Sequence, residues 1–175
     1  MTIEALRSGS VDVLDDLLAR FGPELQRVAY LILHDHAGAE DVVTDTLVTA
    51  FERGASLRDS AALRPWLLRI ATNHALSQRR RRLRVVTLAV LPDIVDTGSS
   101  PDPDDQVALW QGVSELPLRM RAAIVLRYYA DLPVEDVAMA LSVSPNTVKS
   151  QLQAALQRLR RTLGDEMPTG ELRHA

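Results

Sequence analysis

Apolar residues recur at a helical period over the first part of the chain. They predict one helix over 11–21 and a second, antiparallel helix over 25–32. Pro23 stands between the two apolar stripes, where it is expected to break the chain direction.

Two further helices follow in the same pattern. After the turn "HDHAG", apolar positions over 42–51 predict a third helix, which Gly54 closes. Pro65 suits the first position of a fourth helix, which runs into the arginines at 79–82. These helices predict a four-helix unit over 10–84.

The stretch "DTGSSPDPDD" (96–105) has the Gly, Pro, Ser and Asp content of a solvated linker. It marks a flexible acidic connector over 85–103 and a second unit over 104–164, followed by a tail at 165–175. Helices are expected in that unit at about 104–115, 117–129, 133–141 and 145–163. No strand alternation is visible, so the sequence predicts an all-α protein of two small helical domains.

Charge is segregated along the chain, although the net charge is only −3. No acidic residue occurs from Ser60 to Pro92, whereas the connector has aspartates without Lys or Arg, and 137–164 is again basic. A local basic surface is what attracts a polyanion. Two basic segments on either side of an acidic connector therefore point to nucleic acid.

Composition argues against disulfide-bonded, exported and membrane-inserted proteins. The chain has no cysteine, which rules out disulfides and thiolate metal sites, so a cytoplasmic location is expected. The N-terminus lacks a signal-peptide pattern, and the apolar run "VVTLAVLP" is far shorter than the ~20 residues that span a bilayer. We expect no export and no membrane insertion.

The stretch "VEDVAMALSVSPNTVKSQL" (134–152) has the pattern of a helix-turn-helix. Its apolar positions have the spacing that locks two helices together, and small Ala138 permits close approach. Ser144 is the expected N-cap of the second helix, with Pro145 at its first position, while Ser142 stands where the motif usually has glycine. The exposed residues expected to meet DNA are Ser144, Asn146, Thr147, Lys149, Ser150 and Gln153.

The helix from Pro65 to Arg82 carries the residue types that bind single-stranded DNA. Arginines bind phosphates, and Trp or Asn can stack on or bond unstacked bases. The residues expected to contribute are Arg64, Trp66, Arg69, Asn73, His74, Ser77, Arg80 and Arg81. Trp66 could equally belong to the core, and the arginines could be a solvated helix end that complements the helix dipole.

The two halves together resemble the extracytoplasmic-function (ECF) group of bacterial sigma factors. The resemblance rests on "AEDVVTDTLVTAFE" (39–52), "LRPWLLRIATNHALSQRRRR" (63–82), the acidic connector and the segment 115–160, in that order. It implies that 10–84 is sigma region 2 and that 104–164 is region 4. The implied partners are core RNA polymerase, through its β′ clamp helices and β flap, and promoter DNA in duplex and single-stranded form. An anti-sigma factor is a further candidate partner.

The resemblance also implies residue roles. Glu40, Asp41 and Asp45 match the acidic helix that grips the β′ clamp, and Asn73 matches a base-contacting asparagine. The loop Ser56–Leu63 and the following helix match the part that captures a flipped base of the minus-10 element. Region 4 is then expected to read the minus-35 element as duplex.

Two other classes compete with this interpretation. A regulator of the LuxR type would use the same C-terminal motif without polymerase, but it needs a receiver or ligand-binding domain that the N-terminal pattern lacks. An enzyme could be imagined from His34 and His36, which have no third metal ligand at a recognisable spacing. We expect no catalysis, no cofactor and no bound metal.

Overall fold

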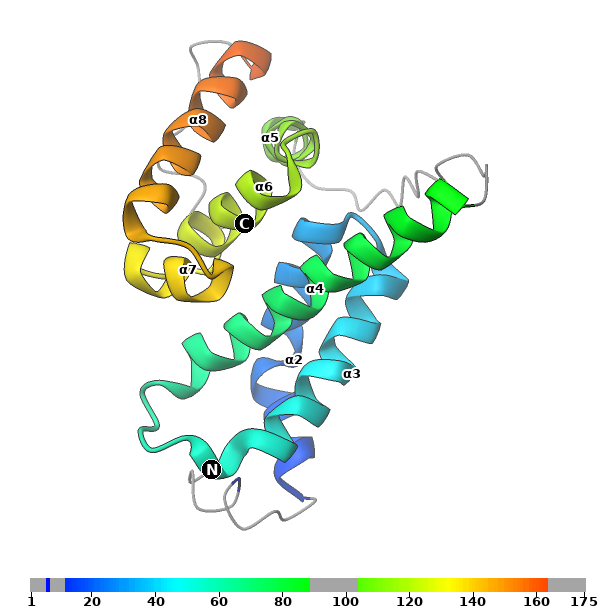
Figure 1. Cartoon of the computed structure of the whole chain (residues 1–175), viewed down its shortest axis with the longest axis vertical. Coiled ribbons are helices and arrows are strands. Elements are labelled where there is room, and N and C mark those ends of the chain that lie inside the picture. Colours follow the sequence, from blue (N-terminus) through cyan, green and yellow to red (C-terminus); the bar gives the residue numbers. More distant parts are fainter. Residues whose placement is uncertain (1–5, 7–11, 89–103, 164–175) are drawn as a thin grey trace.

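The computed structural model describes residues 6, 12–88 and 104–163, and every element in these ranges is helical (Figure 1). This agrees with the predicted all-α class. The predicted tail and residues 89–103 of the predicted connector lie outside the described residues. None of the described helices combines the length and apolar character needed to cross a membrane.

The N-terminal unit contains three long helices within the described residues. These are α2 (Asp12–Leu33), α3 (His36–Arg53) and α4 (Leu63–Leu88), with a 3₁₀ turn η1 (Gly54–Ser56) after α3. The C-terminal unit contains α5 (Asp104–Ser114), α6 (Leu118–Ile124), a π-helical turn η2 (Val125–Tyr129), α7 (Val134–Leu141) and α8 (Pro145–Leu163). Helix α4 begins two residues before Pro65 and continues past position 84 into the segment assigned to the connector.

The prediction of two antiparallel helices around Pro23 is wrong, because α2 passes through this residue without a break. The apolar stripe keeps its phase across the proline, with Phe21 and Leu25 both buried in the same core. Pro23 is itself exposed, and so is Ala19, whose carbonyl loses its intrahelical donor. Water can replace that donor, so packing on the buried side maintains the helix.

The stretch predicted as the turn "HDHAG" is mostly helix. Only His34 and Asp35 separate α2 from α3, because Asp35 caps α3 by accepting a hydrogen bond from the amide of Gly38 at 3.1 Å. A Cβ at Gly38 would lie 2.7 Å from Oδ2 of Asp35, so glycine permits this approach. Burial raises the pKa of Asp35, but the Gly38 amide and the guanidinium of Arg82 outweigh it and bring the pKa below its ordinary value.

Gly54 ends α3, as the sequence predicted, and is its C-cap. Its φ of −60° is right-handed, and η1 starts there. Gly54 is buried, and a Cβ at this position would collide with the side chain of Leu6, which is only 2% exposed. The glycine therefore lets a residue from before α2 pack directly on the backbone.

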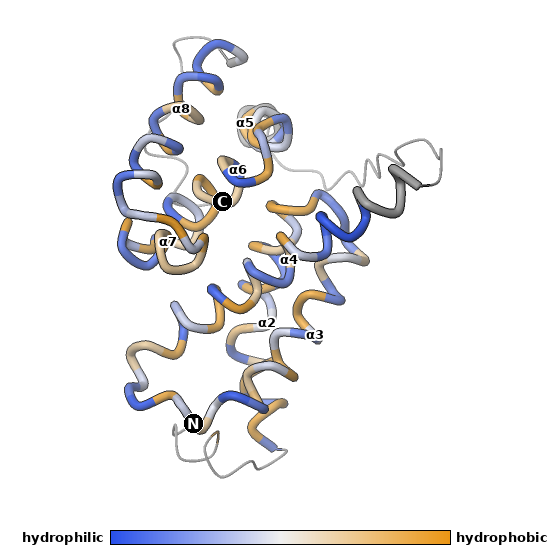
Figure 2. Tube along the Cα trace, viewed as in Figure 1, coloured by the Kyte–Doolittle hydropathy of each residue, from blue (hydrophilic) through white to orange (hydrophobic). Residues whose placement is uncertain are grey.

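One apolar core extends through both units. Fully buried leucines and isoleucines of α2 and α4 belong to the same cluster as those of α6, α7 and α8. Helix α4 packs against α7, and α2 packs against η2 and α6. The apolar residues that make this core appear as orange segments on each helix, separated by blue exposed ones (Figure 2). The two units are thus held in a closed arrangement.

Two arginines cross the boundary between the units, and each one caps a helix of the other unit. Arg64 of α4 donates a hydrogen bond to the carbonyl of Ala130, at the end of η2, at 2.7 Å, and also pairs with Glu24. Arg121 of α6 donates to the carbonyl of Ile32, near the end of α2, at 2.8 Å. Carbonyls in the last turn of a helix lack intrahelical donors and carry its negative dipole end, so a cation there is stabilising.

His34 lies at the same boundary. Burial is the main cause of the lowered pKa of its imidazole, and the charge of Arg121 lowers it further, whereas a backbone hydrogen bond to Trp110 opposes them. Tyr30 and His36 pack near it, with the Tyr30 ring edge-on to His34 at 5.5 Å between centroids. The boundary between the units therefore favours the neutral imidazole.

We expect stability to fall as pH drops below about 6.5, the ordinary pKa of histidine. The lowered pKa of folded His34 means that the unfolded chain takes up the proton first, so the free energy of unfolding is fully retained above that pH and declines below it. Denaturant unfolding between pH 7.5 and 5.5 measures this. The His34→Gln variant should respond less steeply, and an equal slope in both proteins would assign the response to other groups.

Candidate DNA and polymerase interfaces

Helices α7 and α8 form the helix-turn-helix that the sequence predicted. Val137, Leu141, Val148 and Leu152 are all buried, and Ala138 is 4% exposed between the two helices. Val143 in the turn is half-buried against the same cluster. The local spacing of apolar residues is therefore enough to place α8 across α7.

The turn between these helices is built from two serines. Ser142 has a left-handed backbone with φ 54°, and its amide donates to the carbonyls of Ala138 and Met139. Ser144 caps α8, because its Oγ accepts a hydrogen bond from the amide of Thr147 at 3.1 Å. Ser142 thus occupies the conformation that favours glycine, at a cost of about 1 kcal/mol.

One side of the N-terminal half of α8 is exposed, and this half carries no acidic side chain. Three of the six predicted DNA-binding residues there, Asn146, Lys149 and Gln153, are exposed without a local role in the turn. The hydroxyls of Ser144, Thr147 and Ser150 make hydrogen bonds within the first turns of the helix. Asn146, Lys149 and Gln153 therefore form the part of this surface best placed to reach a base or a phosphate.

Helix α4 divides its residues between the core and solvent. Its buried side includes Leu67, Leu68 and Ala71, and its exposed side includes Arg69, Asn73, Arg80, Arg81 and Arg82. Trp66 is half-buried and packs on the core, in line with the alternative considered for it. The exposed side keeps an asparagine one turn after an arginine, with the arginine cluster further along.

Three other residues predicted to bind DNA are engaged inside the protein. Arg64 pairs with Glu24 and bonds to Ala130, as described above. His74 faces α3, where Nε2 lies 2.9 Å from Oγ1 of Thr49 and Nδ1 lies 3.8 Å from Oδ2 of Asp45. Ser77 accepts a hydrogen bond from Arg80 at 3.1 Å. In this conformation, Arg64 and His74 join elements of the fold while their side chains stay partly exposed, at 40% and 32%.

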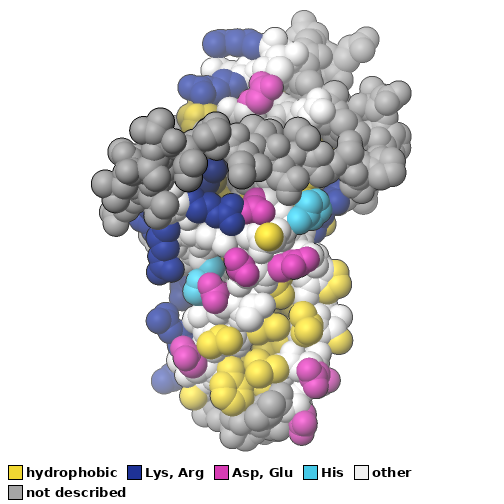
Figure 3. Space-filling model, turned by 90° about the vertical axis from the view of Figure 1, so that its right-hand side faces the viewer, with side chains coloured by type: hydrophobic (Ala, Val, Ile, Leu, Met, Phe, Trp, Pro, Cys, Tyr) yellow, Lys and Arg dark blue, Asp and Glu magenta, His cyan; other side chains and the backbone are white. Residues whose placement is uncertain are grey.

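A polar cleft of about 380 Å³ lies between α3 and α4. It contains two of the three predicted polymerase-binding residues together with residues predicted to bind DNA, and it is lined by Asp41, Thr44, Asp45, His74, Ser77, Gln78 and Arg81. Gln78 donates to Asp41 across it at 3.4 Å. The third acidic residue, Glu40, is exposed beside them. Acidic side chains spread over the middle of this face, with Lys and Arg along one edge (Figure 3).

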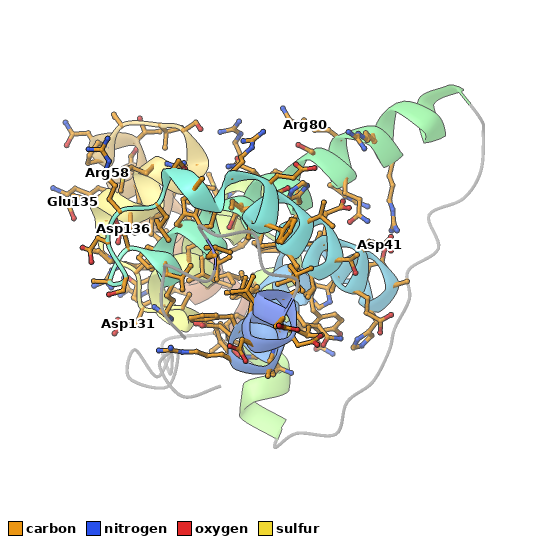
Figure 4. All side chains as sticks on the ribbon, turned by 90° about the horizontal axis from the view of Figure 1, so that it is seen from below. Asp41, Arg58, Arg80, Asp131, Glu135 and Asp136 are labelled. Atoms are coloured by element: carbon orange, nitrogen blue, oxygen red, sulfur yellow. The ribbon has the colours of Figure 1, made fainter. Side chains whose placement is uncertain are left out.

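The cleft brings together two predicted sites that the sequence treated as separate. Figure 4 shows Asp41 and Arg80 at the same end of the molecule, on α3 and α4, while Arg58 lies at the opposite end. Arg58 is exposed in the loop before α4 and was not singled out from the sequence. Its position in the stretch Ser56–Leu63 is the only signal that could have indicated it.

Comparison with known proteins identifies the family. Residues 17–85 match the family model "Sigma-70 region 2", and residues 106–159 match "Sigma-70, region 4". The ECF RNA polymerase sigma factor SigM of Mycobacterium tuberculosis is 31% identical over 158 residues, which cover 90% of this chain and 80% of SigM. This chain belongs to the ECF RNA polymerase sigma factors. SigL of the same species is 32% identical over 145 residues, with 79% of this chain and 82% of SigL covered.

Solved structures agree with this sigma-factor fold. The sigma factor RpoE in complex with the anti-sigma factor NepR from Bartonella quintana superposes with a TM-score of 0.74 at 27% identity, over 89% of this chain and 99% of RpoE. CnrH, in complex with the cytosolic domain of CnrY, superposes with a TM-score of 0.66 at 22% identity, over 94% and 96% of the two chains, which supports the fold alone.

The family assignment removes the LuxR-type interpretation, and the family it gives is one whose members are not generally enzymes. The region 2 match occupies the half of the sigma factor where a LuxR-type regulator would need a receiver or ligand-binding domain. His36 stacks on Tyr30 with 4.2 Å between ring centroids, and His34 packs at the boundary between the units. Within 12–82 and 109–162, where side chains are described, no group of three His, Asp or Glu residues is placed to hold a metal ion.

We expect Ser142→Gly to stabilise the sigma factor by about 0.5–1 kcal/mol. Glycine adopts the left-handed conformation without the steric cost that serine has, although it gains entropy in the unfolded chain. Thermal unfolding measures the effect as a rise in Tm. The comparison is Ser144→Ala, which should lower the stability by about 1 kcal/mol through loss of the helix cap. A lower Tm for Ser142→Gly would contradict strain at this turn.

Proposed function

We propose that this RNA polymerase sigma factor initiates transcription through three surfaces with separate partners. The exposed half of α8 reads duplex DNA, the exposed side of α4 holds melted DNA, and the acidic side of α3 binds core RNA polymerase. The proposal rests on one observation: the chain carries two helices with exposed DNA-binding chemistry. Helix α8 has an exposed side without acidic residues in its N-terminal half, and α4 has exposed arginines and an exposed asparagine. The assignments extend the family's general function to named residues.

The minus-35 element is assigned to α8. Its N-terminal residues enter the major groove in the usual geometry of a helix-turn-helix, where Asn and Gln can bond a base edge and Lys can contact a phosphate. Asn146, Lys149 and Gln153 are the exposed residues with this chemistry. The first-turn hydroxyls of Ser144 and Thr147 position the helix by capping it.

The minus-10 element is assigned to α4 and the loop before it. Arg69, Arg80 and Arg81 supply positive charge for the backbone, and exposed Asn73 supplies hydrogen bonds for an extruded base. Unstacking a base costs a few kcal/mol, which contacts of about 1–3 kcal/mol each must offset. The protein thus favours melted DNA because these contacts exist only when the strand is open, and no covalent chemistry is needed.

Core RNA polymerase is assigned to the exposed acidic residues of α3. Asp41 and Asp45 are exposed, and each has a contact to α4, with Gln78 and His74 respectively. Both carboxylates stay exposed to solvent beside these contacts, so a cationic partner can reach them. The β flap is the corresponding partner expected for region 4.

The proposed function also implies a regulatory partner and a place of action for the sigma factor. RpoE is described in complex with the anti-sigma factor NepR, so we infer an anti-sigma partner for this chain as well. Exposed apolar side chains occur on both units for such a partner to cover: Leu18 (47%), Val48 (50%) and Met139 (55%). RNA polymerase and the chromosome are in the bacterial cytoplasm, so this is where the sigma factor would act.

The direct test is reconstitution with bacterial core RNA polymerase. The purified protein should form a stable complex with core enzyme and initiate transcription from a genomic DNA pool at a shared two-part motif. Sequencing the transcripts would give that motif. Binding to duplex DNA without any complex with core enzyme would contradict the assignment of α3 and α4.

We expect Asp41→Arg to abolish binding to core RNA polymerase. Charge reversal removes a carboxylate from the proposed clamp surface and adds repulsion toward a cationic partner. Size-exclusion co-elution with core enzyme measures the effect. Asp16→Arg makes the same change at an exposed position on α2 and should retain co-elution. Retained binding by Asp41→Arg would refute the clamp assignment.

We expect Asn73→Ala to weaken binding to a single-stranded minus-10 oligonucleotide by about tenfold, the loss of one base contact of about 1–3 kcal/mol. Binding to a duplex minus-35 fragment should stay unchanged. Fluorescence anisotropy with holoenzyme measures both affinities. Gln26→Ala, at an exposed position on α2, serves as the control. Equal losses on the two ligands would remove Asn73 from the base-contacting set.

A further inference from the structure

The second half of α8 carries arginines that belong to none of the three proposed surfaces. Arg158, Arg160 and Arg161 are all exposed, and the latter two lie in the last turn of the helix. Among the described residues, no carboxylate forms an ion pair with any of them. The sequence has no acidic residue over 137–164, so this end of α8 presents positive charge to a partner.

A polar stripe joins one of these arginines to the residues proposed to read the minus-35 element. Arg160 follows Lys149 by 11 residues, which is about three turns of helix, so the two side chains project from the same side of α8. Gln153 and Gln157 lie between them and are both exposed. Arg158 follows Lys149 by 9 residues, or about two and a half turns, and therefore projects from the opposite side.

The described helices leave this stripe uncovered. Helix α8 packs on α5, α6 and α7 through its buried residues, which include Val148, Leu152 and Leu159. It forms an outer edge of the C-terminal unit (Figure 1). A ligand can therefore approach the exposed side of α8 along most of its length.

The chemistry of the stripe fits DNA phosphates better than a protein surface. Protein interfaces have apolar and aromatic side chains at their core, whereas the exposed residues on this side from Lys149 to Arg160 are polar or cationic. Guanidinium groups bind phosphate oxygens through charge-assisted hydrogen bonds. Arginines in a last turn also complement the helix dipole, but that effect does not depend on the side from which they project. It therefore does not explain the alignment of Arg160 with Lys149.

Helix α8 is also longer than a major groove is wide. Its 19 residues span about 28 Å, whereas the major groove of B-DNA is about 12 Å wide. A recognition helix contacts base edges through its N-terminal residues, so the last turns of α8 extend over the phosphate backbone at the edge of the groove. Lys149 and Arg160 are about 16 Å apart along the helix axis, so they can meet phosphates on opposite strands.

We propose that Arg160 binds a DNA phosphate across the major groove from the phosphate bound by Lys149, so that α8 brackets the groove. The inference rests on the proposed assignment of α8 to the minus-35 element. Asn146 and Gln153 then contact bases, while Arg160 adds affinity that does not depend on base sequence, because phosphates carry no sequence information.

Affinity for duplex DNA tests this contact against a matched control. The full chain is titrated without polymerase, by fluorescence anisotropy, into a minus-35 duplex and a mixed-sequence duplex of equal length. Arg160→Ala should weaken both complexes about tenfold and make the slope of log K against log salt shallower by about one. Arg158→Ala removes an equal charge from the opposite side of α8 and should leave both affinities nearly unchanged. Equal losses in the two variants would overturn the proposal, because they would show a general effect of charge.

Neutral phosphate analogues locate the two contacts. A methylphosphonate replaces one phosphate at a time on either strand of the minus-35 duplex, which removes the charge of that phosphate. The unsubstituted sigma factor should lose affinity at a position on each strand. Arg160→Ala should become insensitive to the replacement on one strand, and Lys149→Ala to the replacement on the other. Insensitivity at the same position in both variants would overturn the bracket.

The outcomes separate this inference from the proposed function. Unchanged duplex affinity in Arg160→Ala, with weaker co-elution with core RNA polymerase, would assign this arginine to a protein partner and overturn the inference alone. Unchanged affinity in Asn146→Ala, Lys149→Ala and Gln153→Ala would overturn the assignment of α8 to DNA. Circular dichroism checks that each variant retains its helices, since loss of a contact with the helix dipole would lower Tm without changing the salt slope.

Discussion

The arrangement of this sigma factor depends on two helix ends that are each capped from the other unit. The last turn of α2 and the end of η2 both present carbonyls at the boundary between the units, and burial without donors would cost about 1–3 kcal/mol for each group. Arg121 and Arg64 supply those donors. Burial, followed by the nearby charge of Arg79, lowers the pKa of Arg121 to about 10, so it remains a cation near neutral pH. Permanent charge and several donors explain why arginine is used here.

The contacts between the units also determine which side of α4 is free to bind a partner. One side of this helix must be apolar to join the core shared with α2 and α3, and its start must hold Arg64 against Glu24 and Ala130. Only the remaining side is free for a partner, and there Arg69 and Asn73 are exposed. The middle of the helix is therefore the part whose exposed side chains have no contact with the C-terminal unit to lose.

The sequence was informative wherever structure depends on near neighbours and less so where distant residues decide it. The apolar spacing around Val137 and Val148 and the cap at Ser144 are local, and the structure agrees with the predicted helix-turn-helix. Pro23 was misinterpreted because the continuity of α2 depends on the packing of its buried side, and the close contact of Leu6 with Gly54 likewise joins segments far apart in the sequence. The carbonyl of Ala130, which accepts from Arg64, lies 66 residues away at the end of a π-helical turn that the sequence pattern did not predict. The positive charge of Arg64 suggested DNA from the sequence, whereas its partners in the fold are the carboxylate of Glu24 and the carbonyl of Ala130.

Separation of charge over short distances makes two partners possible on neighbouring helices. The Debye length at physiological ionic strength is about 8 Å, so charges on adjacent helices are only weakly screened from each other. The fields of acidic α3 and basic α4 therefore partly cancel where the two helices meet. Neutral Gln78 bonds to Asp41, and His74 lies between Asp45 and Thr49, so these two acidic side chains of α3 contact an amide and an imidazole on α4. Arg82, at the far end of the row, pairs with Asp35 and holds α4 against the start of α3. Arg80 and Arg81 remain exposed, which leaves the basic edge available to a polyanion despite a net charge of −3.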